Sequence, residues 1–239
     1  MSVHLVGGGW APEHYAAVYG PFVGEASARA TAAGRTEPRI AIIAVRGDGD
    51  DEHSTALTAA LAAAGPFEPI ITTLGLDGLA ALTAVGNVDG IVVGGGLTPA
   101  YLAAVAPIAG EIRRQVSAGI PYLGFSAGAM IAAERALIGG WRIGGVEVAS
   151  QAGSEDLDEV TIEHGIGLLD VTVEVHAAQW GTLSRLIAAT EAGLIEGGLA
   201  IDENTALVVG EGALGVVGAG SVWRVSQAPD GVLVSTFGG

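Results

Sequence analysis

Cysteine and lysine are both absent from this chain of 239 residues. Without cysteine, the chain has no disulfide framework, no thiolate nucleophile and no cysteine-ligated metal. Without lysine, a phosphate-binding P-loop, a Schiff base and a Ser–Lys dyad are excluded. All ten cations are arginine, and the formal net charge is −16. That charge argues against a nucleic-acid partner, which needs a basic face, and the lack of cysteine suits a cytoplasmic protein.

Long apolar runs are also missing. Hydrophobic residues make up 50% of the chain and charged residues 15%, which is enough apolar material for a core. Glycine, threonine, proline or a charge nevertheless interrupts each apolar stretch before ~18 residues, so we expect no membrane span. The start, Met1–His4, has no basic segment followed by an apolar one, which predicts no signal peptide. We expect a soluble acidic protein with one domain over residues 1–239.

Short β-branched runs alternate with Ala/Leu-rich segments of helical pattern. Strands are predicted at 4–6, 39–44, 69–73, 88–93 and 120–125, and helices at 15–33, 54–64, 76–85, 98–117 and 127–137. This alternation predicts an α/β fold of three layers, a mostly parallel open sheet with helices on both faces. The acidic stretch 47–52 is interpreted as a solvated loop. Short strands from residue 199 onward predict a C-terminal antiparallel β-meander along the sheet edge.

The sharpest local motif is Gly124-Phe125-Ser126-Ala127-Gly128, between a predicted strand and a predicted helix. This is the context of a nucleophile elbow, in which a tight turn lifts the serine hydroxyl out of the sheet. The amide of Ala127 is then a candidate oxyanion donor at the start of the helix. The alternative is a chance match in a chain with 39 glycines.

A nucleophilic serine needs a base. His176 lies 50 residues after Ser126 and follows the predicted strand 168–175, so we expect it at the carboxyl edge of the sheet, where ligands of α/β proteins bind. His164 lies among acidic residues and is interpreted as a surface residue. The glycines at 94–96 follow a neighbouring strand, and the amides of Gly95 or Gly96 are candidate second donors to an oxyanion. No histidine or carboxylate spacing near the elbow predicts a metal site, and we expect no cofactor.

Taken in order, these segments resemble the cyanophycinase and peptidase E (aspartyl dipeptidase) group of serine peptidases, which has the class I glutamine amidotransferase-like fold. The similar segments are the glycine loop at 92–98, the Ser-Ala-Gly-Ala turn at 124–129, the histidine segment at 165–176 with 181–186, the acidic turn at 198–207 and the hairpin at 220–223.

The resemblance implies hydrolysis of small peptides through an acyl-enzyme, with acidic, isoaspartyl or β-Asp-linked peptides as candidate substrates. Ser126 would attack the carbonyl, and His176 would move the proton. The third, acidic member lies in the family a short way past the nucleophile helix, where Glu147 is the first candidate and Glu134 the second. Because relatives in this family often form dimers, the resemblance also implies a homodimer.

Several positions depart from the family pattern. Leu97 stands where the family has an amide side chain, and Glu174 begins the pair before the histidine, where cyanophycinase has Asp-Gln. Gln179 and Trp180 occupy positions of an arginine cluster, of which Arg185 remains. These five residues are the candidate substrate contacts, and Trp180 is a candidate aromatic wall of the pocket.

Two other functions stay open. An esterase-type α/β-hydrolase would need an acid followed by a far C-terminal histidine, and the chain has no such histidine after the elbow. A non-catalytic, amidotransferase-like protein that binds a small ligand is the main alternative, because the departures at Leu97 and Trp180 alter substrate contacts.

Overall fold

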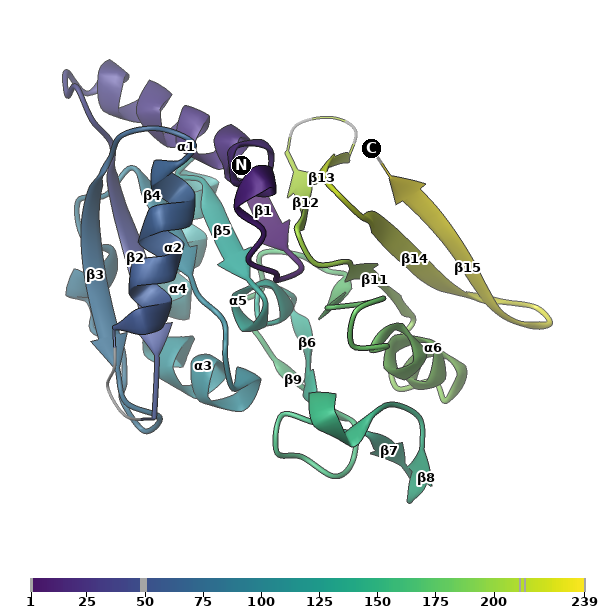
Figure 1. Ribbon diagram of the computed structural model, residues 1–239. Helices are drawn as coiled ribbons and strands as arrows, with labels where there is room; N and C mark the ends of the chain where they lie inside the picture. Colours follow the sequence, from purple (N-terminus) through teal and green to yellow (C-terminus); the bar gives the residue numbers. More distant parts are fainter. Residues whose placement is uncertain (1, 48–50, 211, 213, 239) are drawn as a thin grey trace.

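A seven-stranded sheet forms the centre of the protein, in the order β13-β12-β1-β5-β4-β2-β3 (Figure 1). The computed structural model describes residues 2–47, 51–210, 212 and 214–238, so residues 48–50 of the predicted acidic loop lie outside the described part. The strands are β1 (Val3–Val6), β2 (Arg39–Val45), β3 (Glu68–Leu74), β4 (Gly90–Val93), β5 (Tyr122–Phe125), β12 (Thr205–Val209) and β13 (Gly215–Gly218). The first five are parallel, and β12 and β13 add antiparallel strands beside β1. The predicted α/β fold is confirmed.

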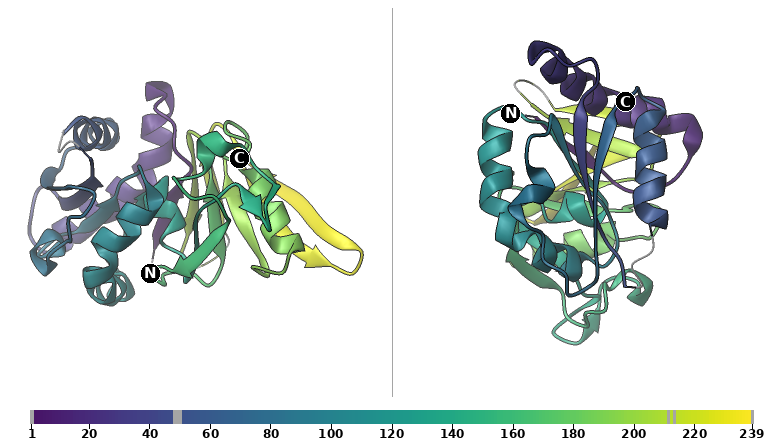
Figure 2. Two further views of the ribbon diagram at one scale, coloured as in Figure 1. Left: turned by 90° about the horizontal axis from the view of Figure 1, so that it is seen from below. Right: turned by 90° about the vertical axis from the view of Figure 1, so that its left-hand side faces the viewer.

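Helices cover both faces of this sheet (Figure 2). Their bounds are α1 (Tyr15–Ala32), α2 (Glu52–Ala62), α3 (Thr98–Val105) and α4 (Ala109–Ser117). Ile40 and Ile42 of β2 pack in the core cluster of α1 and α2, whereas Ala41 and Ile43 pack in the cluster of α3 and α4. Successive strand residues point to opposite faces, so an uninterrupted apolar strand is what a sheet covered on both sides requires.

A second sheet of four strands lies beside the first, in the order β10-β11-β14-β15 (Figure 1). It contains β10 (Thr172–Val175), β11 (Gly197–Ile201), β14 (Ser221–Ala228) and β15 (Gly231–Gly238), with α6 (Leu183–Glu191) between β10 and β11 in the chain. The predicted C-terminal meander is therefore divided: β12 and β13 extend the central sheet, and the other strands do not. The Asp202 carboxylate accepts bonds from the Ser221 N–H (2.9 Å) and Trp223 Nε1 (3.0 Å), which attach the start of β14 to the turn after β11.

The helix predicted at 127–137 is much shorter. The chain forms α5 (Ala127–Met130) and then β6 (Arg135–Gly139). The carbonyl groups of residues 131–133, which a longer helix would use, instead accept N–H groups from residues 166–168. Tertiary contacts thus override the helical propensity of an Ala-rich segment.

Two other predicted helices differ for local reasons. The segment 98–117 is divided into α3 and α4 by the turn η3 (Ala106–Ile108), which contains Pro107, and proline lacks the N–H that a helix interior needs. Of the segment 76–85 only η2 (Leu82–Val85) is helical, and Leu79 and Leu82 are exposed rather than on a buried face. In the described part of the chain no helix is both long and apolar enough to cross a membrane.

The remaining elements are short turns and strands. They are η1 (Pro12–His14), β7 (Arg142–Ile143), β8 (Val146–Glu147), η4 (Gln151–Gly153) and β9 (Thr161–His164). Gly7, Gly94 and Ser126 directly follow β1, β4 and β5, and His176 directly follows β10 of the second sheet. Strand ends of both sheets therefore meet at one place, which is where α/β folds bind ligands.

Candidate active site

Ser126 occupies a strained turn between β5 and α5. Its backbone has φ 51° and ψ −110°, a region that residues other than glycine rarely adopt. The Ser126 N–H donates to the Val6 carbonyl (2.9 Å), which fixes the turn to the neighbouring strand. A Cβ on Gly128 would lie 2.1 Å from the Val93 carbonyl oxygen, so glycine is needed where this turn passes the sheet. This geometry has the tight strand-to-helix turn that a nucleophile elbow requires.

The structure brings His176 to Ser126 from the end of β10. The distance from His176 Nε2 to Ser126 Oγ is 2.9 Å, within the range of a hydrogen bond. The His176 N–H donates to the Gly7 carbonyl (3.0 Å), and the residue has φ 55°. A Cβ on Gly8 would lie 2.1 Å from His176 Cε1, so the backbone of Gly8 supports the imidazole from close by. His176 and Ser126 are thus held by the ends of strands from both sheets.

Glu203 is the acidic partner of the imidazole. His176 Nδ1 lies 2.7 Å from Glu203 Oε1, on the ring edge away from Ser126. The Glu203 N–H donates to Gln179 Oε1 (2.9 Å), so Gln179 holds the turn that carries Glu203 rather than facing the cavity. With Nδ1–H donated to a carboxylate, Nε2 is the acceptor that faces the serine hydroxyl.

The contact between His176 and Glu203 corrects the expected acidic member of the triad, which was Glu147 or Glu134. Glu147 lies on the exposed β8, where its carboxylate is 3.8 Å from Arg142, and Glu134 is exposed beside β6. Neither contacts His176. The sequence contained a signal for Glu203, because the acidic turn 202–203 follows the histidine segment, but position along the chain did not show that this turn returns to the end of β10.

Trp180 covers the face of the imidazole. Its ring stacks on that of His176 with centroids 3.9 Å apart and planes inclined by 6°. The Trp180 N–H donates to the His176 carbonyl (2.9 Å), so the two residues are also tied by their backbone. Trp180 is 48% exposed and lines the cavity, which is consistent with the predicted aromatic wall.

Burial governs the protonation of His176. Removal from water lowers the pKa of His176 below its ordinary value, and the Glu203 carboxylate opposes this by raising it. The neutral imidazole is therefore favoured near neutral pH, which is the form that accepts a proton from serine.

A cavity of about 410 Å³ opens over Ser126 and His176. Leu97 and Trp180 contribute apolar surface to its lining, Arg46 contributes a cation and Glu155 a carboxylate. The Glu155 Oε2 atom accepts the Thr98 N–H (2.8 Å), and burial raises the pKa of Glu155. The cavity has room for a small ligand with groups of both charges. In the described part of the chain, no three histidine or carboxylate side chains gather as metal ligands.

The glycine loop supplies one fewer free amide than expected. The Gly95 N–H donates to Nε2 of the buried His53 (2.9 Å), so it is not available to an oxyanion. No hydrogen bond of the described residues uses the Gly96 or the Ala127 N–H. The candidate oxyanion donors are therefore reduced to Gly96 and Ala127.

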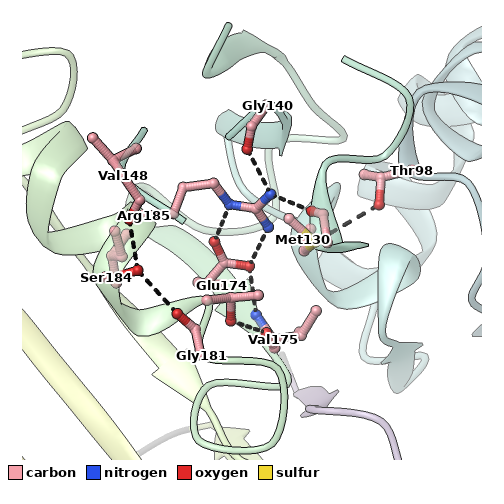
Figure 3. A network of polar contacts seen from close by, with 12 residues as sticks. Thr98, Met130, Gly140, Val148, Glu174, Val175, Gly181, Ser184 and Arg185 are labelled. Atoms are coloured by element: carbon pink, nitrogen blue, oxygen red, sulfur yellow. Dashed lines mark hydrogen bonds and ion pairs between the residues drawn. The ribbon is translucent and has the colours of Figure 1, made fainter. Parts of the chain in front are cut away.

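Arg185 and Glu174 form a buried ion pair (Figure 3). Neither residue lines the cavity. Arg185 Nε and Nη2 donate to the two Glu174 oxygens at 2.7 and 2.9 Å, and Nη1 donates to the carbonyls of Gly140 (3.0 Å) and Gly153 (2.6 Å). The two side chains are 2% and 0% exposed. The structure corrects their expected role in substrate contact: they anchor the segment around Gly153 that continues into the cavity wall.

The sequence matches the family model of peptidase family S51 over residues 43–217. No curated protein sequence matches the chain. Among solved structures, a peptidase from an acI-B1 Actinobacterium superposes with a TM-score of 0.61 at 17% identity, covering 99% of this chain and 93% of that one. A protein of Listeria monocytogenes EGD-e named for peptidase E superposes with a TM-score of 0.53 at 14% identity, covering 92% and 98%. The structures share the fold, and the family match covers most of the chain: this protein belongs to peptidase family S51, a family of serine peptidases.

Proposed function

We propose that the protein hydrolyses amide bonds of small peptides through an acyl-enzyme on Ser126, with His176 as the base and Glu203 as its orienting acid. The observation that carries the proposal is the continuous chain of contacts from Ser126 Oγ to His176 Nε2 (2.9 Å) and from His176 Nδ1 to Glu203 (2.7 Å). This is the order of roles in a serine–histidine–acid triad.

The chemistry follows from these contacts. Ser126 Oγ attacks the substrate carbonyl carbon while its proton passes to His176 Nε2, and the oxyanion accepts the N–H groups of Gly96 and Ala127. The C–N bond then breaks, and the imidazolium returns the proton to the leaving amine. Water, deprotonated by the same imidazole, cleaves the ester and frees Ser126.

The cavity lining supports a preference for small peptides with an acidic group near the scissile bond. A cavity of about 410 Å³ suits a short peptide better than a folded protein. Arg46 lines this cavity, and a Cβ on Gly96 would lie 3.4 Å from Arg46 Nη1, which places the guanidinium beside a proposed oxyanion donor. A carboxylate of the substrate would therefore meet a cation close to the reacting carbonyl.

A panel of dipeptides tests this function. Wild type is expected to hydrolyse dipeptides that contain aspartate or glutamate faster than the same dipeptides with asparagine or glutamine in their place. Arg46→Met is expected to reduce that difference in rate. Ser126→Ala and His176→Ala should lose hydrolysis, while Ser117→Ala and His164→Ala, at exposed positions, should retain it. Hydrolysis that survives Ser126→Ala would refute the proposal, and tight peptide binding without turnover would favour the ligand-binding alternative.

A further inference from the structure

The glycine loop Gly94–Gly96 has a nearly complete set of backbone partners. The Gly94 N–H donates to the Ile43 carbonyl and the Gly94 carbonyl accepts the Gly128 N–H, both at 2.9 Å. These bonds attach the first glycine to β2 and to the segment after the nucleophile. Buried backbone groups are almost always paired. A backbone N–H of this loop that has no partner among the described residues, such as that of Gly96, is therefore a candidate donor to a ligand.

Gly95 is held by side chains rather than by backbone. Its N–H donates to His53 Nε2 (2.9 Å), and its carbonyl accepts the Tyr101 hydroxyl (3.0 Å). His53 comes from α2 and is 5% exposed, and Tyr101 comes from α3 and is 0% exposed. Helices from both faces of the central sheet thus each send one polar side chain to the same residue.

The two side chains approach the loop closely. A Cβ on Gly94 would lie 2.7 Å from His53 Nε2 and 3.0 Å from the Tyr101 hydroxyl, and a Cβ on Gly95 would lie 2.7 Å from Ser126 Cβ. The clamped residue is therefore packed directly against the proposed nucleophile. A shift of Gly95 would move the following amide relative to Ser126.

We propose that His53 and Tyr101 are positioning residues that fix Gly95 and thereby select the Gly96 N–H as a donor of the oxyanion hole. The inference rests on the proposed function, because it needs an oxyanion on the substrate of Ser126. Tyr101 does not line the cavity, and the Nε2 atom of His53, which does line it, is engaged by the Gly95 N–H. Their role is to keep the Gly95–Gly96 peptide in the orientation that an oxyanion requires, so that no reorganisation is needed during the reaction.

The protonation states suit these roles. Burial and the charge of Arg46 lower the pKa of His53 to about 4, so the ring is neutral near neutral pH, and the Gly95 N–H makes Nε2 the acceptor. Burial raises the pKa of Tyr101, so its hydroxyl stays protonated and can donate. A leucine at position 53 removes the acceptor, whereas glutamine restores one in its side-chain carbonyl.

The rate of reaction with an alkyl fluorophosphonate tests the clamp without knowledge of the natural substrate. In this reaction the Ser126 Oγ–phosphorus bond forms, the phosphorus–fluorine bond breaks, and fluoride leaves while His176 takes the serine proton. The phosphoryl oxygen occupies the oxyanion position. We expect His53→Leu and Tyr101→Phe to slow labelling about 10- to 100-fold, below the ~10²–10³-fold effect of deleting a donor outright.

Matched variants separate positioning from packing. His53→Gln should recover most of the rate, and Tyr19→Phe, which removes a buried hydroxyl from α1, should label like wild type. Thermal unfolding confirms that each variant is folded. If His53→Leu does not fold, Tyr101→Phe decides alone.

Wild-type rates in folded Tyr101→Phe and His53→Leu would overturn the clamp while leaving the proposed function intact. A His53→Gln variant as slow as His53→Leu would overturn the acceptor role of His53. A wild-type protein that takes no label on Ser126 would overturn the proposed function, and this inference with it.

Discussion

The indole of Trp180 lies flat on the imidazole of His176, with ring centroids 3.9 Å apart and planes inclined by 6°. The same imidazole is bounded by the backbone of Gly8, and its two nitrogens face Ser126 and Glu203. The ring is thus fixed on one face by Trp180, near Cε1 by the backbone of Gly8 and at both nitrogens by hydrogen bonds. This fixed orientation is what the proposed reaction of Ser126 requires of its base.

Loss of the stacked ring should loosen His176. Because such aromatic pairs contribute about 0.5–1.5 kcal/mol, we expect Trp180→Ala to lower kcat about 3- to 10-fold and Trp180→Phe to stay near wild type. Steady-state kinetics with the best dipeptide measures both. An equal loss in Trp180→Ala and Trp180→Phe would show that the indole contacts substrate instead.

Glu203 and Glu147 make a matched pair of variants. Glu203→Gln should lower kcat/KM by about 10²- to 10⁴-fold, because the imidazole loses its orienting carboxylate, whereas Glu147→Gln should have little effect. The pH profile gives a second reading. Neutral His176 is the active form, so activity rises with pH through its pKa, and wild type should reach half its plateau below pH ~6.5.

The substitution Glu203→Gln should also shift the midpoint of the pH profile in a definite direction. Glu203 raises the pKa of His176, so the residual activity of Glu203→Gln should reach half its plateau at lower pH than wild type. A midpoint that stays in place or moves up would contradict the pairing of these two residues.

Gly8→Ala should displace the imidazole. The added Cβ would lie 2.1 Å from His176 Cε1, whereas Gly34, which also has positive φ, has open space where its Cβ would be. Gly8→Ala and the control Gly34→Ala each carry a backbone cost of about 1 kcal/mol, but only Gly8→Ala should abolish hydrolysis. Circular dichroism melting would confirm that both variants fold, and an active Gly8→Ala enzyme would refute the close support of the ring.

The buried ion pair of Arg185 and Glu174 should contribute to the free energy of unfolding. Arg185→Met leaves the Glu174 carboxylate and two carbonyls without their partner, and we expect a loss of about 3–5 kcal/mol in the free energy of unfolding. Arg114→Met, which removes an exposed pair with Glu111, should change it little. Urea unfolding measures both, and Glu174→Leu combined with Arg185→Met should recover part of the loss. Equal midpoints for Arg185→Met and Arg114→Met would contradict an anchoring role.

Much of the fold followed from local pattern. The apolar run of β2 predicts a strand buried on both faces, and Ile40 and Ala41 indeed pack in different clusters. The segment after α5 departs from its helical pattern because its carbonyls bond to the N–H groups of residues 166–168, which lie too far along the chain for propensity to reveal. Likewise, the division of the C-terminal strands between two sheets is a matter of long-range strand pairing, in which β12 pairs with β1 and β14 pairs with β11.

The candidate site was likewise only partly predictable from the sequence. Ser126 is marked by its motif and His176 by its place after a strand, and the structure brings them together. Glu203 depends on how the turn after β11 returns to β10, which spacing alone does not show. The pairing of Glu174 with Arg185 was hidden because charged residues are usually exposed, and only the burial of both reveals an anchor.

The most direct test of the proposed acyl-enzyme is the mass of the intact protein after treatment with an alkyl fluorophosphonate, followed by peptide mapping. We expect one adduct, on Ser126, that is absent from Ser126→Ala and forms far more slowly in His176→Ala. An unmodified wild-type protein, or an adduct that persists in Ser126→Ala, would contradict it.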